Sequence, residues 1–431
     1  MQTLPQEKTE KRVYIGIAMI PSTMFRSIAT ACLLGLMMPH LTAQEKKLTP
    51  MMGWASWNNF RTGINESIIK QQADALVSSG LRDAGYTFIN IDDGYFGGRD
   101  KDGNVLVNPT RFPNGMKVLA DYIHGKGLKA GLYSDAGINT CGSWYDKDTI
   151  GAGMGLFGHE RQDLNLFLAQ WQYDFIKVDW CGGDWLKLDE EQRYTYISQL
   201  IKEIAPRTMF NVCRWRFPGK WVVGIADSWR ISGDIVNSFE SLLKIIDENA
   251  DLWPYAGPGH VNDMDMLQVG RGMSFEEDKT HFSMWAMLCS PLIAGNDLTK
   301  MSPQTIRILT NKEMIAIDQD PLVYQARRIV DYGDQEVWAR PLHSTMSGEV
   351  AVALLNRSNT ASRITFSMDI LGIDASKGYT LHDVWSRQDY PSSHEPQNSF
   401  QVPAHGVIVL TIRGVSKPYN VFQFAAGPPK N

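Results

Sequence analysis

The sequence contains 431 residues, of which 43% are hydrophobic and 21% charged, a composition typical of a globular protein large enough for two domains. The formal net charge of -5 gives no reason to expect nucleic acid or an anionic membrane as a partner. The 13 Trp residues are a heavy load, which suits either core packing, the commoner use, or a sugar-binding cleft.

The first 46 residues are predicted to be a signal peptide with an N-terminal extension. An apolar run from Ser27 to Met38 follows Arg26 and precedes Leu41-Thr42-Ala43, a small-residue cleavage site. The run is shorter than the ~20 residues of a membrane-spanning helix, so we predict export to the periplasm or the extracellular space without a membrane span. The sequence does not decide whether translation starts at Met1 or at Met24.

Cysteine usage is compatible with export. Removal of the signal leaves four cysteines, for which three pairings are possible: Cys141, Cys181, Cys213 and Cys289. No CxxC or HExxH spacing is present. We therefore predict neither a metal nor a cofactor.

Residues 47–325 alternate short apolar runs with amphipathic stretches. The predicted strands are Gly53–Ser56, Tyr86–Asp92, Leu128–Asp135, Tyr173–Asp179, Thr208–Cys213, Trp229–Gly233, Gly259–Asn262 and Pro291–Gly295. The predicted helices include Glu66–Leu81, Gly115–Gly127, Asp163–Gln172 and Asp189–Ile204. Eight strands separated mostly by helices predict an α/β fold, a closed (β/α)8 TIM barrel.

Residues 326–431 follow a different pattern. Short strands with Gly, Asn or Ser turns and no helical periodicity predict a small all-β C-terminal sandwich. These strands are Glu336–Arg340, Glu349–Leu355, Ser362–Ser367, Tyr379–Trp385 and Val407–Arg413. The sandwich carries few clustered acids, so packing is favoured over accessory carbohydrate contact as its role.

The run Ile176-Lys177-Val178-Asp179-Trp180-Cys181 organises the predicted barrel. Residues two apart on a strand share a face, so Lys177 and Asp179 point into one pocket, and an ammonium beside a carboxylate favours its ionised, nucleophilic form. A structural ion pair is the alternative. Several other strands also end in acids or aromatic residues, which together suit a pyranose: acids accept its hydroxyl groups and aromatic faces cover its C–H surface.

Seven strand-end motifs occur in the order seen in one known family. They are Gly53-Trp54-Ala55-Ser56-Trp57-Asn58, Asp92-Asp93-Gly94-Tyr95, Gly131-Leu132-Tyr133-Ser134-Asp135-Ala136-Gly137, Thr140-Cys141, Lys177-Val178-Asp179-Trp180-Cys181, Trp229-Arg230-Ile231-Ser232-Gly233-Asp234 and Asn262-Asp263-Met264-Asp265-Met266-Leu267. With these motifs the chain resembles glycoside hydrolase family 27, the α-galactosidases and α-N-acetylgalactosaminidases, over nearly its whole mature length.

The resemblance implies a retaining double displacement, with Asp179 as nucleophile and Asp234 as acid and base. Such a reaction needs the two carboxyl groups about 5 to 5.5 Å apart and in environments that separate their pKa values. Nothing in the sequence keeps Asp234 protonated, and Arg230, four residues earlier, would oppose protonation if it lay close by.

The resemblance also implies the substrate contacts. Asp92 and Asp93 would take the 6- and 4-hydroxyls and Lys177 the 3-hydroxyl region. The other implied contacts are Arg230 and Asp265 with nearby hydroxyls, Trp54 and Tyr133 as walls, and Cys213 and Trp215 beside the pocket. A helix N-cap is the alternative for Asp92 and Asp93. For Asp263 a helix cap and indirect support of the site are equally favoured. We interpret Trp57 as a core aromatic.

The family commonly joins the two cysteines that correspond to Cys141 and Cys181, so the resemblance implies this disulfide here. Cys289, after the apolar run Phe282 to Leu288, is predicted to be a buried free thiol. We expect structural roles for His260 and His281.

One position departs from the pattern of many α-galactosidases. Arg214 stands where they carry Glu, and Arg only donates hydrogen bonds. It either changes what the loop binds or points outward. The predicted activity is removal of terminal α-linked galactose from oligo- or polysaccharides, with oligomeric state unassigned. The alternatives are a β-L-arabinopyranosidase, an α-N-acetylgalactosaminidase or an isomaltodextranase-like enzyme.

Two hypotheses from other classes are disfavoured. A carbohydrate-binding protein without catalysis would be expected to lack Asp179 or Asp234, and both are present. A phosphate-handling barrel isomerase needs a Gly-rich phosphate site near the last two strands, where Asp263 and Asp265 would repel a phosphate.

Overall fold

The computed structural model describes residues 48–343 and 349–417, which belong to one compact unit from Lys46 to Asn431. The predicted signal sequence and both alternative starts lie outside the described residues. Within those described ranges, no helix combines the length and apolar character that crossing a bilayer requires.

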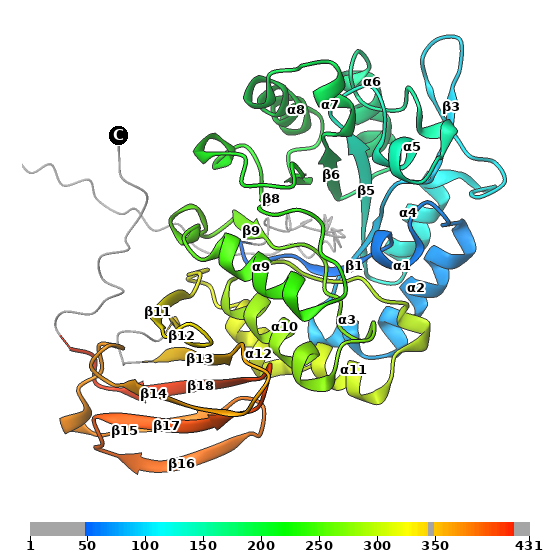
Figure 1. The fold of residues 1–431 in the computed structure, drawn as a ribbon. Coiled ribbons are helices and arrows are strands. Elements are labelled where there is room, and N and C mark those ends of the chain that lie inside the picture. Colours follow the sequence, from blue (N-terminus) through cyan, green and yellow to red (C-terminus); the bar gives the residue numbers. More distant parts are fainter. Residues whose placement is uncertain (1–47, 344–348, 418–431) are drawn as a thin grey trace, which may run out of the picture. The chain divides into compact units, whose positions relative to one another are not determined.

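The barrel is a parallel sheet of eight strands in the order β10-β1-β2-β5-β6-β7-β8-β9. Figure 1 labels β1, β5, β6, β8 and β9 of this sheet. The strands are β1 (Met52–Ala55), β2 (Phe88–Ile91), β5 (Lys129–Asp135), β6 (Phe175–Asp179), β7 (Met209–Val212), β8 (Ser228–Arg230), β9 (Val261–Asp263) and β10 (Leu292–Ala294). After β9, Leu267 forms an isolated parallel bridge with Ala294, and its N–H donates to the Ile293 carbonyl at 2.7 Å. This bridge closes the sheet. The predicted TIM barrel is confirmed, and each predicted strand is present.

Helices and short turns connect the barrel strands. The α-helices are α1 (Trp57–Phe60), α2 (Glu66–Ser78), α3 (Leu81–Ala84), α4 (Gly115–Gly125), α5 (Cys141–Tyr145), α6 (Glu160–Leu164), α7 (Cys181–Trp185), α8 (Glu190–Ile204), α9 (Phe239–Asn249), α10 (Phe275–Met287), α11 (Pro303–Leu309) and α12 (Lys312–Asp318). Single helical turns of the 3-10 type are η1 (Thr149–Gly151), η3 (Lys220–Val222), η4 (Trp253–Tyr255), η5 (Leu298–Lys300) and η7 (Ala375–Lys377).

Helix α8 forms where the sequence predicts it. Asp189 caps it, its side chain accepting from the Gln192 N–H at 2.8 Å, and the buried Tyr194, Ile197 and Ile201 recur on one face. The predicted helix Asp163–Gln172 differs in its bounds. It begins earlier, as α6, and continues as the π-helix η2 (Asn165–Gln170), a wider form that residue periodicity does not reveal.

An antiparallel hairpin of β3 (Phe96–Arg99) and β4 (Val105–Val107) follows β2 and was not predicted. Gly97 and Gly98 occupy the middle of β3, and glycine weakens a strand signal. Tertiary contacts hold the hairpin, because Arg99 Nη2 lies 2.6 Å from Asp163 Oδ2 on α6.

The C-terminal part is an antiparallel sandwich. A six-stranded sheet, ordered β11-β12-β13-β18-β15-β16, faces the pair β14-β17. Its strands are β11 (Arg327–Asp331), β12 (Gln335–Pro341), β13 (Val350–Asn356), β14 (Ser362–Ser367), β15 (Tyr379–Asp383), β16 (Gln388–Ser393), β17 (Gln397–Val402) and β18 (Val407–Gly414). The predicted sandwich is confirmed. The sequence missed β11, β16 and β17, whose side chains are largely polar or exposed and lack an apolar alternation.

Strand β13 and helix α10 join the barrel to the sandwich. Along β13 alternate residues enter two cores: Val350, Val352 and Leu354 pack inside the sandwich, whereas Ala351, Ala353 and Leu355 join the barrel core. Helix α10 is buried along most of its length and packs against β13 and β18. Trp385 Nε1 donates to Ser283 Oγ of this helix at 2.9 Å. Both faces of β13 are therefore apolar, which explains why its run reads as continuously hydrophobic.

Candidate active site

A cavity of about 610 Å³ opens at the carboxyl ends of the barrel strands. This volume lies within the roughly 300 to 1,000 Å³ of small-molecule sites. The lining residues are Trp57, Asn58, Arg61, Asp92, Cys141, Tyr145, Lys177, Asp179, Trp215, Arg230, Asp234, Ile235, Val236, Asn237, Asp265, Met266, Gln268 and Arg271. Seven predicted site residues are thus brought together here: Asp92, Lys177, Asp179, Trp215, Arg230, Asp234 and Asp265.

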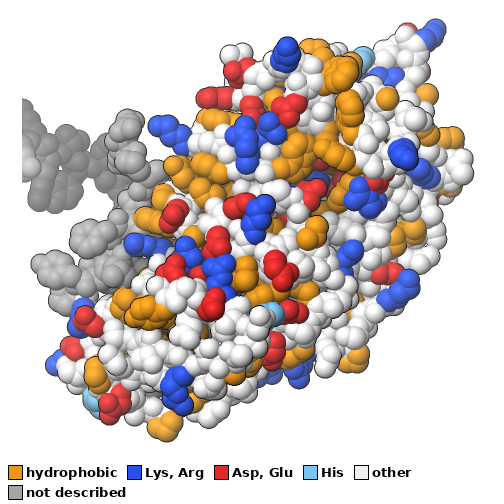
Figure 2. Space-filling model, viewed as in Figure 1, with side chains coloured by type: hydrophobic (Ala, Val, Ile, Leu, Met, Phe, Trp, Pro, Cys, Tyr) orange, Lys and Arg blue, Asp and Glu red, His pale blue; other side chains and the backbone are white. Residues whose placement is uncertain are grey.

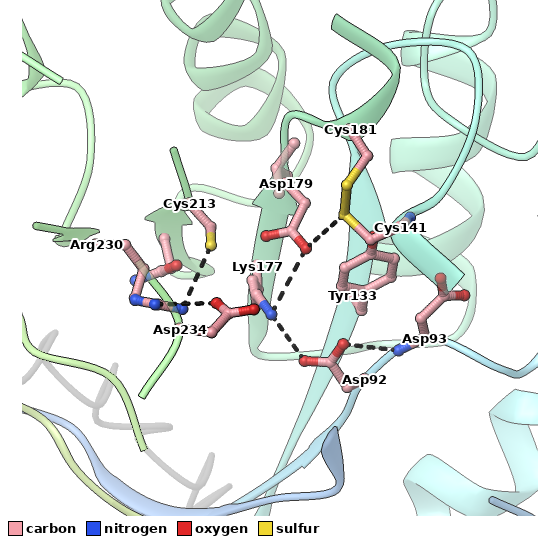
Figure 3. A network of polar contacts seen from close by, with 12 residues as sticks. Asp92, Asp93, Tyr133, Cys141, Lys177, Asp179, Cys181, Cys213, Arg230 and Asp234 are labelled. Carbon is pink, nitrogen blue, oxygen red and sulfur yellow. Dashed lines mark hydrogen bonds and ion pairs between the residues drawn. A yellow bond between two sulfur atoms is a disulfide. The ribbon is translucent and has the colours of Figure 1, made fainter. Parts of the chain in front are cut away.

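Lys177 lies between two carboxylates at the end of β6 (Figure 3). Its Nζ is 3.0 Å from Asp92 Oδ2 and 3.7 Å from Asp179 Oδ2, and it sits over the Tyr133 ring, 5.4 Å from the centroid. Burial lowers the pKa of Lys177, but Asp179 and Asp92 outweigh it, so the pKa is raised well above its ordinary value. Lys177 is a fixed positive charge at the floor of the cavity.

Asp179 is buried, and its two oxygens have different surroundings. Oδ2 faces Lys177 and lies 3.2 Å from the Cys141 sulfur, whereas Oδ1 has no hydrogen-bond partner among the described residues. Burial raises the pKa of Asp179 to about 6, although Lys177 opposes the rise. The ammonium therefore only partly offsets the cost of burying this carboxylate.

The disulfide implied by the family resemblance is present between Cys141 and Cys181. The two cysteines are the first residues of α5 and α7, so the bridge ties these helices together beside Asp179. Cys213 and Cys289 are buried free thiols, which confirms the prediction for Cys289. Asp135 lies close enough to both bridged sulfurs for a shared metal ion, but disulfide sulfurs are not thiolate ligands and the group does not fit one.

The other wall is built around Arg230. Its Nη2 lies 3.0 Å from Asp265 Oδ2 and 3.1 Å from Asp234 Oδ1. The Asp265 and Arg230 side chains are buried, while that of Asp234 is 60% exposed. Burial raises the pKa of Asp234, but Arg230 and then Lys177 oppose it, and the net shift is downward. Arg230 therefore opposes protonation of Asp234, as the sequence analysis expected if the two residues lay close together.

Two cavity residues have backbone conformations that L-amino acids seldom adopt. Trp215 has a φ of 58° and Asp265 a φ of 78°, both in the left-handed region. The turn at Asp265 is held by two backbone N–H groups, from Ile235 and Met266, that each donate to its carboxylate at 2.8 Å. Such strain persists only where surrounding contacts enforce it, and it commonly marks functional sites.

Four predicted site residues do not line the cavity. Trp54 is fully buried and donates its indole N–H to the Asn296 carbonyl at 2.8 Å, so it is not a wall. Asp93 is buried and accepts from the Gly142 N–H of α5 at 2.7 Å, but the N-cap of that helix is Thr140 and β2 is followed by β3, so neither Asp92 nor Asp93 is the helix N-cap of the alternative. The two others support the floor: the Tyr133 hydroxyl accepts from the Cys141 N–H at 3.0 Å, and the Cys213 sulfur lies 3.8 Å from Arg230 Nη1.

Trp57 was interpreted as a core aromatic. It is partly buried against a small core cluster, but it also lines the cavity, which the interpretation did not include. The guanidinium of Arg61 lies over its ring, 4.7 Å from the centroid. Trp57, and not the predicted Trp54, reaches the cavity because of where β1 ends. The strand ends at Ala55, so Trp54 still packs inside the sheet, while Trp57 begins α1 at the cavity. The sequence reasoning also missed Tyr145, which ends the short helix α5, and Arg271, which lies in the loop between β9 and α10. Neither lies in a segment long enough to show a periodic signal.

Arg214 is not among the residues that line the cavity. Its Nη2 lies 3.1 Å from Asp184 and its Nε 3.2 Å from Glu190, and its side chain is only 16% exposed. Arg214 therefore neither lines the pocket nor points outward to solvent, and instead forms salt bridges with two acidic side chains.

Three further side chains have supporting places. Asp263 accepts from Asn211 Nδ2 and from the Asp265 N–H, each at 2.9 Å, so it supports the wall indirectly. His281 is buried and accepts from the Gln268 N–H at 2.9 Å, and burial lowers its pKa to about 3. His260 stacks on Trp229. Neither histidine lines the cavity.

Comparison with known proteins gives consistent similarities. The family profile described as alpha galactosidase A matches residues 49–320, and that of the alpha galactosidase C-terminal beta sandwich domain matches residues 332–412. Alpha-galactosidase A from Cellvibrio japonicus is 43% identical over 388 residues, covering 84% of this chain and 92% of that protein.

Solved structures share the architecture. Alpha-galactosidase I from Mortierella vinacea superposes with a TM-score of 0.80 at 32% identity, covering 86% of this chain and 99% of that one. An alpha-galactosidase from Saccharomyces cerevisiae, solved with raffinose, has a TM-score of 0.77 at 27% identity and covers 85% and 98% of the two chains.

Proposed function

The chain belongs to the α-galactosidase family, and we propose that it is a retaining exo-α-galactosidase that releases terminal α-linked galactose from oligo- or polysaccharides. One observation carries the proposal. A buried carboxylate with a free oxygen, Asp179, shares a cavity with a more exposed carboxylate, Asp234, and a fixed cation, Lys177. A double displacement needs such a nucleophile and acid in one site.

In the first step, Asp179 attacks the anomeric carbon of galactose while the bond to the leaving oxygen breaks. The proton of Asp234 moves to that oxygen, so an alcohol departs and a galactosyl ester of Asp179 remains. The unpartnered Oδ1 is the proposed attacking atom, because Oδ2 faces Lys177. In the second step, Asp234 takes a proton from water, the water oxygen attacks the anomeric carbon, and the ester bond breaks to restore both carboxyl groups.

The substrate itself is proposed to set the protonation of Asp234. In the free protein Arg230 and Lys177 hold the pKa of Asp234 low, and they outweigh the partial desolvation of this 60% exposed side chain by the cavity walls. A leaving group that covers Asp234 would exclude water from its carboxyl group. This loss of hydration raises the pKa of Asp234 and favours the protonated acid in the complex.

Galactose recognition is proposed to rest on the floor of the cavity. Asp92, paired with Lys177 at 3.0 Å, is positioned to accept from the sugar hydroxyls, and Trp57 and Trp215 are proposed walls. Asp265 and Arg230 bind further hydroxyls. Asp93, Tyr133 and Cys213 act through the residues that they support, and Trp54 has no contact with substrate in this proposal.

The test is hydrolysis of four nitrophenyl glycosides: α-galactoside, α-N-acetylgalactosaminide, β-L-arabinopyranoside and α-glucoside. We expect a clear preference for the α-galactoside, judged by kcat/KM. A preference for another sugar would replace α-galactosidase with one of the alternative specificities. Absence of turnover on all four would reject the proposed activity.

We also propose that the mature chain is exported, with residues 1–46 as signal and extension, 47–325 as catalytic barrel and 326–431 as sandwich. The apolar run before Leu41-Thr42-Ala43 and the disulfide between Cys141 and Cys181 support export. N-terminal sequencing of secreted protein tests the cleavage site, and an intact N-terminus would contradict it.

A further inference from the structure

Three exposed aromatic side chains crowd the region of the barrel where α5 and α7 lie. Trp144 is 47% exposed, Tyr145 70% and Trp185 68%, and we name these three residues the aromatic rim. Figure 2 shows hydrophobic side chains at the surface over this upper part of the molecule. Keeping large aromatic rings in water is unfavourable, so a contiguous group of them suggests a binding surface.

The disulfide explains why the rim residues meet. Cys141 begins α5 and Cys181 begins α7, and their Cα atoms are 5.2 Å apart. Residues three or four positions later lie one turn along the same helix face. Trp144 and Trp185 are in those positions, and their ring centroids are 5.6 Å apart with an interplanar angle of 47°. The bridge therefore holds two rings as a preformed pair and avoids an ordering cost on binding.

The aromatic rim reaches the cavity through Tyr145, which lines the same cavity as Asp179 and Asp234. Trp144 and Trp185 do not line the cavity and lie beside Tyr145, outside it. The Asp234 side chain is 60% exposed, which leaves its carboxyl group accessible from the cavity mouth. A leaving group of one sugar therefore departs past Tyr145, and a longer one can extend from Tyr145 toward the two Trp rings.

We propose that the aromatic rim binds sugar residues of the leaving group, by stacking of pyranose C–H faces on Trp144 and Trp185. The inference rests on the proposed α-galactosidase function and adds the substrate class: leaving groups of at least two sugars. Polar groups beside the rings suit hydroxyl-rich ligands. Asp184, next to Trp185, is 64% exposed, and Arg61 pairs with Asp146, next to Tyr145. A purely apolar partner would leave these charges desolvated.

The leaving group could belong to a soluble galactosyl oligosaccharide or to a polymer that carries single α-galactosyl branches, and two substrate arms separate these sources. Each of Trp144→Ala, Trp185→Ala and the double variant is assayed on raffinose, on a galactose-branched polysaccharide and on methyl α-galactoside. The methyl group is too small to reach the rim. The measured quantity is kcat/KM on each large substrate divided by kcat/KM on methyl α-galactoside.

We expect this ratio to fall about 3- to 10-fold in each single variant, the range of one aromatic stacking contact, through a rise in KM. Loss on the polysaccharide alone assigns the rim to polymers, and loss on raffinose as well assigns it to oligosaccharides generally. Tyr332→Ala is the matched control, because Tyr332 is a 72% exposed aromatic in the β11–β12 turn of the sandwich. Its ratio should stay constant.

Unchanged ratios on both large substrates in the double variant would overturn the inference. That outcome is distinct from failure of the proposed function, in which the unmodified protein would cleave neither methyl α-galactoside nor the nitrophenyl galactoside. A Trp variant that does not fold is recognised by its circular dichroism, and Trp185→Leu, which keeps apolar volume but removes the ring, then takes its place with the same expected fall.

Discussion

Two buried carboxylates, one in the sandwich and one in the barrel, differ in how their oxygens are satisfied. Glu336 on β12 is fully buried, and three donors meet it: Arg328 at 2.9 Å and Arg357 at 2.7 Å on Oε1, and the Trp338 indole N–H at 2.8 Å on Oε2. Asp179 on β6 has Lys177 3.7 Å from Oδ2, and its Oδ1 has no hydrogen-bond partner in the part of the chain that the structure describes.

This difference in hydrogen bonding distinguishes Glu336, a structural carboxylate, from Asp179, the candidate reactive one. Burying an ion without partners costs free energy, so a fully bonded carboxylate supports the fold, while an incompletely bonded one keeps capacity for a ligand. Burial raises the pKa of Asp179 to about 6, and Glu336 is instead surrounded by cations. We infer that the buried carboxylate of Asp179 lowers the stability of the protein, whereas the fully bonded carboxylate of Glu336 raises it.

The largest expected effect is on turnover. Asp179→Asn should lower kcat by about 10,000-fold or more, as removal of a nucleophile does elsewhere, because no ester can form. Added azide or formate should restore part of the activity on nitrophenyl α-galactoside. Glu336→Gln is the control, and its kcat should stay within about twofold at a temperature where the variant is folded. High unaided activity in Asp179→Asn would exclude Asp179 as nucleophile.

The next effect concerns the acid. Asp234→Ala should reduce glycosylation of substrates with poor leaving groups by about a hundred- to ten-thousand-fold, because their oxygen needs a proton. Aryl galactosides with good leaving groups should lose much less in that step. Single-turnover kinetics on raffinose and on dinitrophenyl galactoside measure it. Equal losses on the two substrates would mean that Asp234 is not the acid.

The two buried carboxylates should affect stability in opposite directions. Glu336→Gln should destabilise the protein by about 3 kcal/mol, because among the described residues it leaves the two arginines with partly exposed partners: Asp247 for both, and Asp331 for Arg328. Asp179→Asn should stabilise it at pH 7.5, by up to about 3 kcal/mol. Urea unfolding measures both changes. A loss of stability in Asp179→Asn at pH 7.5 would contradict the comparison.

The stabilisation by Asp179→Asn should depend on pH. The folded-state pKa of Asp179 is raised from 3.8 to about 6, so the folded protein holds this proton more tightly than the unfolded chain does. As the pH rises from about 4 to about 6, the unfolded chain releases this proton more readily than the folded protein does, so the free energy of unfolding of the unmodified protein falls. The full loss is reached above about pH 6. The advantage of the variant should vanish below pH 4.

The same pKa should appear in activity. With an activated aryl galactoside, Asp234→Ala needs no acid, so its kcat/KM should show a single acid limb where Asp179 ionises, at or below pH 6, because Asp234 contributes to the raised pKa of Asp179. Replacing Lys177 by Met in that background should move the limb to higher pH, because Lys177 lowers the pKa of Asp179. A limb that stays in place would remove Lys177 from this role.

The smallest effect is expected at Arg214. Because Arg214 is bound by Glu190 and Asp184 and does not line the cavity, Arg214→Ala should change kcat/KM on nitrophenyl α-galactoside by less than about threefold. Arg230→Ala, which removes the partner of both Asp265 and Asp234, is the contrasting variant and should lose far more. A large loss in Arg214→Ala would restore the sequence-based view that this residue shapes the pocket.

Much of the fold could be predicted because its signals are local. Apolar runs such as Tyr173–Asp179 identify barrel strands, and polar residues at their ends indicate one open edge. The elements that were missed depend on distant contacts. The hairpin β3–β4 contains two glycines and is held by Arg99 with Asp163, and β16 is an edge strand with exposed side chains. Periodicity carries no information about such contacts.

The site was predicted less completely than the fold. Strand alternation correctly gave Lys177 and Asp179 a common face, but it could not decide which of Trp54 and Trp57 reaches the cavity or which of Asp92 and Asp93 turns inward. Each choice depends on where a strand ends and on what its neighbours bury.

By itself the sequence determined the barrel and sandwich and the chemistry available at the strand ends, because hydrophobic period and residue type are properties of short segments. Only the tertiary structure decided that Asp179 keeps an oxygen without a hydrogen-bond partner among the described residues, that Arg214 pairs with Glu190 and Asp184, and that a disulfide sets Trp144 beside Trp185. Those outcomes depend on distances between residues far apart in the chain, and these distances exist only after the barrel has closed.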